Sequence, residues 1–404
     1  MVFRTEININ CVGNYACGHI YYNQPETHEV KMAQHKIEDI CLARAAELFG
    51  ESEPVGARLK SELRYLDATE SAFHYLVLKE LAELSKEEKA WMLCLGSGAP
   101  FIEYLLGASP INPLPPHYRC GVCRHVEYST EAKDGYDLPQ KMCPVCGNSL
   151  LRDGHNCSAE MHQYNNRGRR AWPYFGVQIS SSVLKRLQRR LDGRLVDAES
   201  KHHIFRDIEL CTTERAEKLR MLSETTGIDT SAIVMDEDAV WRQVAQAQYE
   251  DCRLDMMHPE DRDEAKRKMS NKMVGAEGEA ACSVHDITRI YGYRCGSFSI
   301  YHDLEELQSP VFYATKDDIF DVLIQNGFSA DRGAIMAHRI GWGNKVYLKK
   351  VPSTILGNMN SIDNLWTQHS CMAHIFGDYM LKWYEIHFPQ EYKTVCADFQ
   401  NLTQ

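Results

Sequence analysis

The chain has 404 residues, of which 44% are apolar and 25% charged, and its formal net charge is −11. This is the composition of a folded globular protein, so it excludes disorder over most of the chain, and the length suggests two or three domains at ~150 residues each. No run of ~18 uncharged apolar residues is present, which excludes a transmembrane helix. The opening residues, MVFRTEININ, lack the pattern of a signal peptide. We therefore expect a cytoplasmic protein with no membrane partner.

The first part of the chain predicts an irregular start followed by helices. Residues 1–36 contain scattered Asn, Gly and Pro residues that interrupt regular structure. We therefore expect an N-terminal arm or a short strand pair there. Apolar residues then recur at helical spacing over 37–50 and 56–86. Ser85 and Glu88 have the spacing of a capping box, which predicts that a new helix starts there.

The later part of the chain predicts one connector and further helices. The proline-rich run 107–117 predicts an extended connector, because proline fixes φ and removes a backbone donor. Residues 207–280 are typical of mostly helical structure. A long apolar and aromatic helix is expected from about 364 to 387, ended by Pro389.

Four of the 15 cysteines form two close pairs. Cys120 and Cys123 make the first pair and Cys143 and Cys146 the second, with 19 residues between them. This spacing is typical of a zinc ribbon. Four thiolates make a closed tetrahedral site, so we expect one structural zinc per chain rather than a catalytic ion. Gly121 and Gly147 are expected to give the two turns their freedom, and His117 and His125 to be packing or surface residues.

The remaining cysteines are scattered, and an odd total in a chain without a signal peptide is a poor disulfide framework. We expect them to be isolated buried thiols.

One segment is basic although the chain is acidic. Residues 164–206 carry ten Lys or Arg against three acids, a local balance of +7. Aromatic residues lie among them, an arrangement that suits stacking on single-stranded nucleic acid. The candidate DNA contacts are Arg167, Arg169, Arg170, Lys185, Arg186, Arg189, Arg190 and Arg194. An equally favoured interpretation is a solvated helix face, because basic pairs recur four residues apart.

The residues around the cysteine pairs resemble a known family. The run INPLPPHY at 111–118, GYDLP at 135–139 and DGH at 153–155 frame the two pairs. Together they look like the zinc-bearing insertion of PolC-type DNA polymerase III alpha subunits of Gram-positive bacteria. Shorter similar stretches follow in the same order from about residue 37 to 399.

The resemblance implies an α+β, mainly helical fold. It would be the remnant of a bacterial replicase palm, related to nucleotidyltransferases of the Pol beta type, with helical fingers and an inserted zinc ribbon. We accordingly expect an N-terminal arm (1–36), a palm- or thumb-like helical region (37–117), the zinc ribbon (118–156), a remnant palm with the basic segment (157–230) and a fingers-like helical region (231–404).

The resemblance also implies where catalytic carboxylates would lie. Two Mg²⁺ ions held by carboxylates drive nucleotide transfer in such a site. Tyr174 and Gly176 occupy the positions of the family's first two aspartates, and neither can bind Mg²⁺. The third position is Glu209, the one candidate catalytic residue that remains. One acid cannot hold two ions, so the sequence does not support a Mg²⁺ cofactor.

Three hypotheses remain open. The first is a truncated, catalytically degenerate PolC-like paralogue that binds DNA, single-stranded or primer-template, or contacts replisome proteins, in a replication accessory or mobile-element role. The second is an active DNA-directed DNA polymerase fragment. The third is a zinc-stabilised protein-interaction module with no nucleic-acid role.

Overall fold

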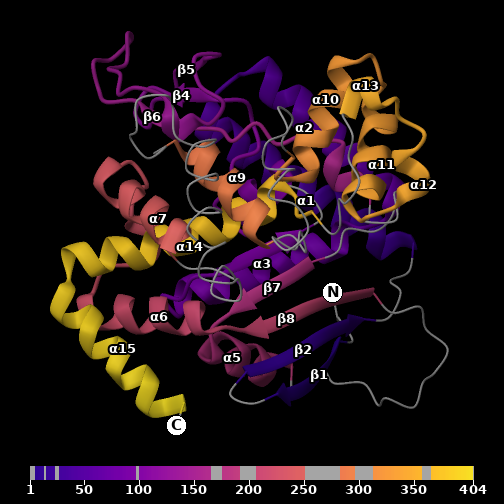
Figure 1. Ribbon diagram of the computed structural model, residues 1–404. Helices are drawn as coiled ribbons and strands as arrows, with labels where there is room; N and C mark the ends of the chain where they lie inside the picture. The colour runs from indigo at the N-terminus through magenta and orange to yellow at the C-terminus, as the bar shows by residue number, and fades with distance from the viewer. Residues whose placement is uncertain are drawn as a thin grey trace, which may run out of the picture.

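A computed structural model describes residues 5–12, 15–22, 27–96, 100–164, 175–191, 206–250, 283–295, 313–356 and 365–403. Within these ranges the chain is a mainly helical α+β protein with two small sheets, as predicted (Figure 1). No helix in these ranges is long and apolar enough to cross a membrane.

The larger sheet brings together strands from both ends of the first half of the chain. Its order is β1-β2-β8-β7-β3, formed by Thr5–Val12, Tyr15–Tyr22, Arg206–Thr212, Phe175–Ile179 and Leu93–Gly96. The N-terminal residues therefore form the strand pair, and β2 pairs with β8 in antiparallel fashion. β8 lies where the sequence predicted mostly helix, so that prediction is wrong at its start.

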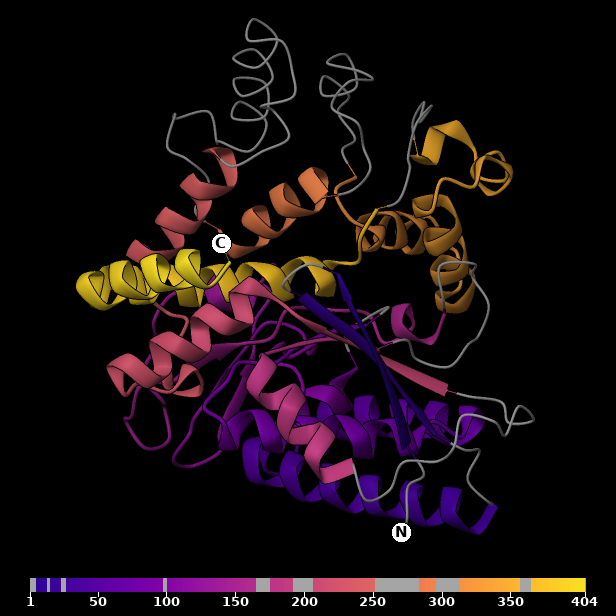
Figure 2. The same cartoon turned by 90° about the horizontal axis from the view of Figure 1, so that it is seen from below.

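One face of this sheet is covered by helices from the N-terminal half. They are α1 (Thr27–Phe49), α2 (Glu53–Thr69), α3 (Ala72–Glu87), α4 (Phe101–Leu105) and α5 (Ser181–Leu191). Figure 2 shows these helices beneath the strands. Val177, Ile208 and Leu210 of the sheet are fully buried in the same apolar core as these helices.

The predicted helix start at Ser85 is wrong. Ser85 is buried inside α3, and Glu88 is the residue that ends this helix. The apolar positions Leu81 and Leu84 continue the buried face of α3 through this point. Burial of that face therefore outweighs the local capping signal.

The opposite face of the sheet packs against helices from the second half of the chain. They are α6 (Glu214–Thr226), α7 (Asp238–Glu250), α9 (Val284–Cys295), α14 (Gln368–His387) and α15 (Pro389–Thr403). Leu93 of β3 lies in their core with Phe376 and Tyr379 of α14. The predicted helix that ends before Pro389 is confirmed as α14, and Pro389 itself begins α15, a position where its missing N–H costs nothing.

A third group of short helices lies at the edge of the molecule (Figure 1). It comprises α10 (Lys316–Gln325), α11 (Ala330–Gly341), α12 (Lys345–Leu348) and α13 (Ser353–Leu356). The group has its own apolar core, which also takes in Met161 and Tyr164. A hydrogen bond from the Tyr164 hydroxyl to Asp331, at 2.7 Å, fixes α11 to the main body.

Candidate metal centre and the β7–β8 strand pair

The paired cysteines lie in turns of a small antiparallel sheet. Its order is β5-β4-β6, formed by Val126–Tyr128, His117–Arg119 and Leu151–Asp153. The proline-rich connector leads directly into β4, and both cysteine pairs project from the same end of the sheet. The predicted ribbon is therefore a discrete small unit with its own core around Tyr118 and Leu138.

The four cysteine sulfurs converge on one point. Their Sγ atoms all lie within 4.8 Å of one another. Cys120 and Cys146 are 3.4 Å apart, and Cys123 and Cys143 are 3.5 Å apart. Sulfurs held 2.3 Å from a tetrahedral zinc lie about 3.8 Å from each other. The set therefore fits one zinc ion with no open coordination position.

The two cysteine turns share one backbone design. The N–H of Cys120 donates to the His125 carbonyl at 2.8 Å, and the N–H of Cys143 donates to Asn148 at 2.7 Å. The residue four positions after each of these cysteines has a left-handed backbone, with φ of 63° at Arg124 and 74° at Gly147. The prediction for Gly147 is confirmed. The prediction for Gly121 is wrong, because Arg124 adopts the strained conformation in the first turn.

Hydrogen bonds favour the thiolate form at the edge of the cluster. The side-chain amide of Asn148 donates to Cys146 Sγ at 3.3 Å. The side chain and the backbone of Asn148 lower the pKa of Cys146 to about 6. A thiolate is the form that binds metal.

The two nearby histidines do not join this cluster. His117 is fully buried, with its Nδ1 atom 2.7 Å from the Pro115 carbonyl oxygen, and its pKa is lowered chiefly by burial. It packs against Phe49 of α1. His125 lies beside Glu127, with 3.9 Å between Nε2 and a carboxylate oxygen. The prediction that both are packing or surface residues is confirmed.

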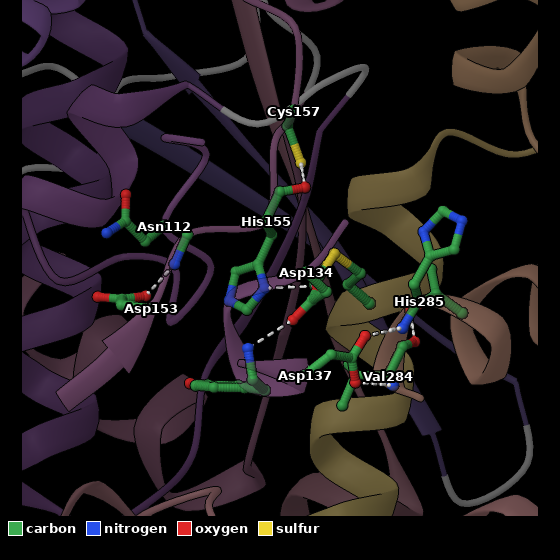
Figure 3. A network of polar contacts seen from close by, with 12 residues as sticks. Asn112, Asp134, Asp137, Asp153, His155, Cys157, Val284 and His285 are labelled. Carbon is green, nitrogen blue, oxygen red and sulfur yellow. Dashed lines mark hydrogen bonds and ion pairs between the residues drawn. The ribbon is translucent and has the colours of Figure 1, made fainter. Parts of the chain in front are cut away.

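A buried polar network joins this unit to the helices behind it (Figure 3). His155 Nδ1 lies 2.8 Å from an Asp134 carboxylate oxygen, and both side chains are almost completely buried. Burial alone would lower the pKa of His155, but the Asp134 carboxylate, its hydrogen bond and Asp153 together raise it above the usual value. This buried contact therefore joins the loop after β5, which holds Asp134, to the segment after β6, which holds His155.

The same network continues to the start of α9. Asp137 accepts hydrogen bonds from the N–H groups of Val284 at 2.6 Å and His285 at 3.2 Å (Figure 3). A carboxylate at this position satisfies the free donors at the N-terminus of a helix. Arg152 of β6 donates to the Asp236 carbonyl at 3.0 Å. Sequence reasoning missed these contacts, since no local pattern pairs residues so far apart.

Strands β7 and β8 place the candidate catalytic positions side by side. The two strands are parallel, and Gly176 stands directly opposite Glu209. Leu95 of β3 and His19 of β2 extend the same row across the sheet. Val177 lies in the core on one face of the sheet, so Gly176, the residue before it on the strand, belongs to the other face. Tyr174 lies outside the described residues.

The basic segment is partly described, as α5. Val183, Leu184 and Leu187 are buried, whereas Lys185 and Arg189 are exposed. This exposure fits both a solvated helix face and a contact with DNA phosphates. The other candidate contacts Arg167, Arg169, Arg170 and Arg194 lie outside the described residues, as does the side chain of Arg190.

Arg186 differs from its exposed neighbours. Its guanidinium bonds to Glu88 and to Glu87 at the end of α3, with 2.5 Å between charged atoms in each pair. The hydrogen bond to Glu88 comes first among the causes that raise the pKa of Arg186. Two carboxylates offset its charge, so Lys185 and Arg189 are the better candidates for phosphate contacts.

The geometry thus brings four cysteines into one cluster that could hold a single zinc ion. No family model matches the chain. A segment is 37% identical over 139 residues to DNA polymerase III PolC-type of Latilactobacillus sakei, covering 33% of this chain and 10% of that protein. The proteins of the same name from Thermotoga maritima and Bacillus subtilis are 35% identical over 136 residues and 34% identical over 139, covering 32% and 33% of this chain and 10% of each relative.

These comparisons show a local relationship to a region of PolC-type DNA polymerase III. The chain spans about a tenth of the length of the curated relatives it matches. The resemblance predicted from the cysteine module is confirmed at this level.

Proposed function

We propose that this chain is a PolC-like protein without polymerase activity that binds DNA in a replication accessory or mobile-element role. In this proposal the five-stranded sheet is a remnant palm, the helices from α7 onward are fingers-like, and the four thiolates hold one structural zinc. The local similarity to PolC-type polymerases supports the relationship.

The register of β7 and β8 carries the proposal. If the third carboxylate of a two-metal site is Glu209, its partners must lie on the adjacent strand, and the adjacent position is Gly176. Glycine offers no side-chain oxygen, and Mg²⁺ requires such ligands. β7 (Phe175–Ile179) contains no acid, so under this proposal the chain lacks the carboxylates that would clamp two ions.

DNA contact is supported by the exposed cations of α5. Lys185 and Arg189 are exposed on one face of the helix, four residues apart. Contacts to phosphate release counterions, so binding through them must weaken as salt rises. The acidic remainder of the chain favours a local contact over a general one.

A gel shift with single-stranded and double-stranded DNA over a salt series tests the proposal. We expect binding at low salt that weakens as salt rises, and a further loss in the Lys185→Glu, Arg189→Glu variant. A Lys60→Glu, Lys393→Glu variant is the matched control, because it makes the same charge change at exposed positions on α2 and α15. Absence of binding at low salt by the unaltered protein would refute a DNA-binding role.

A protein-interaction module is the second candidate, and one observation favours it. The ribbon exposes large apolar side chains, with 69% of Val122, 61% of Met142 and 67% of Val145 open to solvent. Val122 and Val145 lie inside the two cysteine turns. This candidate predicts no salt-dependent DNA binding at all, so the same gel shift separates it from the first.

A further inference from the structure

The turn between α11 and α12 projects an aromatic ring from the molecule. Trp342 ends α11, Gly343 has a left-handed backbone with φ of 81°, and the Asn344 side chain accepts from N–H groups that begin α12. The Trp342 side chain is 49% exposed and Val346 is 65% exposed. We call residues 328–352, which include both helices and this turn, the α11–α12 corner.

The α11–α12 corner is basic within an acidic chain. It carries five Lys or Arg and one acid, Asp331, a local balance of +4 against −11 for the whole chain. Lys345, Lys349 and Lys350 are exposed, as is Arg332. Among the described residues none of these four cations lies within ion-pair distance of a carboxylate, unlike Arg186 on α5.

Cations and aromatic rings are interleaved at the corner. The Arg339 guanidinium and the Lys350 ammonium each lie 4.2 Å from the centre of the Tyr347 ring. These contacts hold the cations in place at the surface.

The Trp342 ring has a cation on its inner side. The ammonium of Lys316 lies 5.7 Å from the ring centre, although Lys316 is only 3% exposed. Gly341 makes room for this lysine, because a Cβ atom there would be 2.6 Å from Lys316 Cγ. The buried Lys316 amine therefore lies on one side of the ring, while half of the surface of Trp342 faces solvent.

The corner is held firmly against the rest of the protein. His338 of α11 bonds to the Met161 carbonyl, with 2.7 Å between Nε2 and the oxygen. Tyr164 bonds to Asp331 on the first turn of α11. A rigid platform loses little conformational freedom when it binds a ligand.

We propose that the α11–α12 corner is a binding site for single-stranded nucleic acid. A base stacks on the exposed side of Trp342, and neighbouring phosphates contact Lys345 and Lys349. Stacking requires a base that is not already paired and stacked in a duplex, which sets the preference for a single strand. The proposal rests on the proposed nucleic-acid role, but it assigns the contact to a surface separate from α5.

Binding to fluorescently labelled oligothymidylate, followed by anisotropy over a salt series, tests the assignment. Trp342→Ala should weaken binding by about 5- to 150-fold, the usual range for loss of one stacked base, and Trp342→Phe should keep most of the affinity. Lys345→Ala with Lys349→Ala should reduce the slope of log affinity against log salt by about 1.4. Trp342 is exposed, so these variants should remain folded, which circular dichroism checks.

The outcomes separate this inference from the proposed function. In one outcome, oligothymidylate binding is unchanged in the corner variants but lost in the Lys185→Glu, Arg189→Glu variant. That result would refute the α11–α12 corner as the binding site but support the DNA-binding role. No binding by the unaltered protein at low salt overturns both. Equal weakening of duplex binding by Trp342→Ala, or equally tight binding of polyglutamate, also overturns the inference, because either result means that bases are not what the ring recognises.

Discussion

Gly176 and Glu209 stand directly opposite each other on the parallel strands β7 and β8, although 32 residues separate them in the sequence. The structure therefore brings together two of the three positions at which the family resemblance implied catalytic carboxylates, and the third, Tyr174, lies outside the described residues. Only one of the two is an acid. Under the proposed function, this pair of positions therefore lacks the carboxylates needed to hold two ions.

We expect no primer extension by this protein with either Mg²⁺ or Mn²⁺. A single carboxylate leaves the attacking and leaving oxygens without a metal clamp. A primer-extension assay with the unaltered protein and Glu209→Ala checks this, and neither should incorporate nucleotide. Incorporation by the unaltered protein that Glu209→Ala abolishes would establish the active-polymerase alternative instead.

Purified protein should contain one zinc per chain, held by the four clustered cysteines. Cys143→Ser should lose nearly all of the zinc and lower the unfolding temperature, because metal binding contributes folding free energy to such a module. Elemental analysis and thermal unfolding measure the two effects. Cys396→Ser is the matched control. Cys396 lies on α15, outside the cluster, so this variant protein should keep its zinc. Metal-free protein with full stability would contradict a structural zinc.

Features set by short stretches of sequence were predictable. The spacing of the cysteine pairs indicated the thiolate cluster, and the apolar run before Pro389 indicated α14. The turn glycines were predicted only in part. Gly147 adopts the left-handed backbone, but in the first turn that conformation falls on Arg124, which no residue preference would suggest.

Contacts between distant segments could not be predicted. The pairing of β2 with β8 depends on which partner each strand finds in the folded chain, because strand preference is largely a matter of packing. The same holds for polar side chains. The Asp134–His155 contact and the ion pairs of Arg186 join residues far apart in sequence. No local sequence pattern predicts them.

Gly377→Ala should destabilise the protein by about 1–3 kcal/mol, the usual cost of overpacking. A Cβ atom at Gly377 of α14 would lie 2.5 Å from Arg215 Cδ and 2.8 Å from Trp91, and Arg215 is already held by Asp378. Gly56→Ala is the matched control on α2, where nothing lies within 4 Å and alanine should add about 0.5–1 kcal/mol. Urea unfolding of both variants compares them. Equal effects would mean that α14 and α6 are not packed so closely.

Asp317→Asn should remove a pH-dependent cost to stability. Burial raises the pKa of Asp317 from 3.8 to about 7, and Asp321 adds to the shift, whereas the N–H of Gln368 opposes it. The folded state then holds this proton more tightly, so stability falls as pH rises from about 4 to about 7 and the cost stays constant above. The amide never ionises. The free energy of unfolding of the variant minus that of the unaltered protein should therefore rise by up to about 1.4 kcal/mol per pH unit between pH ~5 and ~7, then level off. Urea unfolding at several pH values measures this difference. Asp398→Asn, at an exposed position on α15, should show no such rise, and a flat difference for Asp317→Asn would contradict the burial of a protonated carboxyl beside α14.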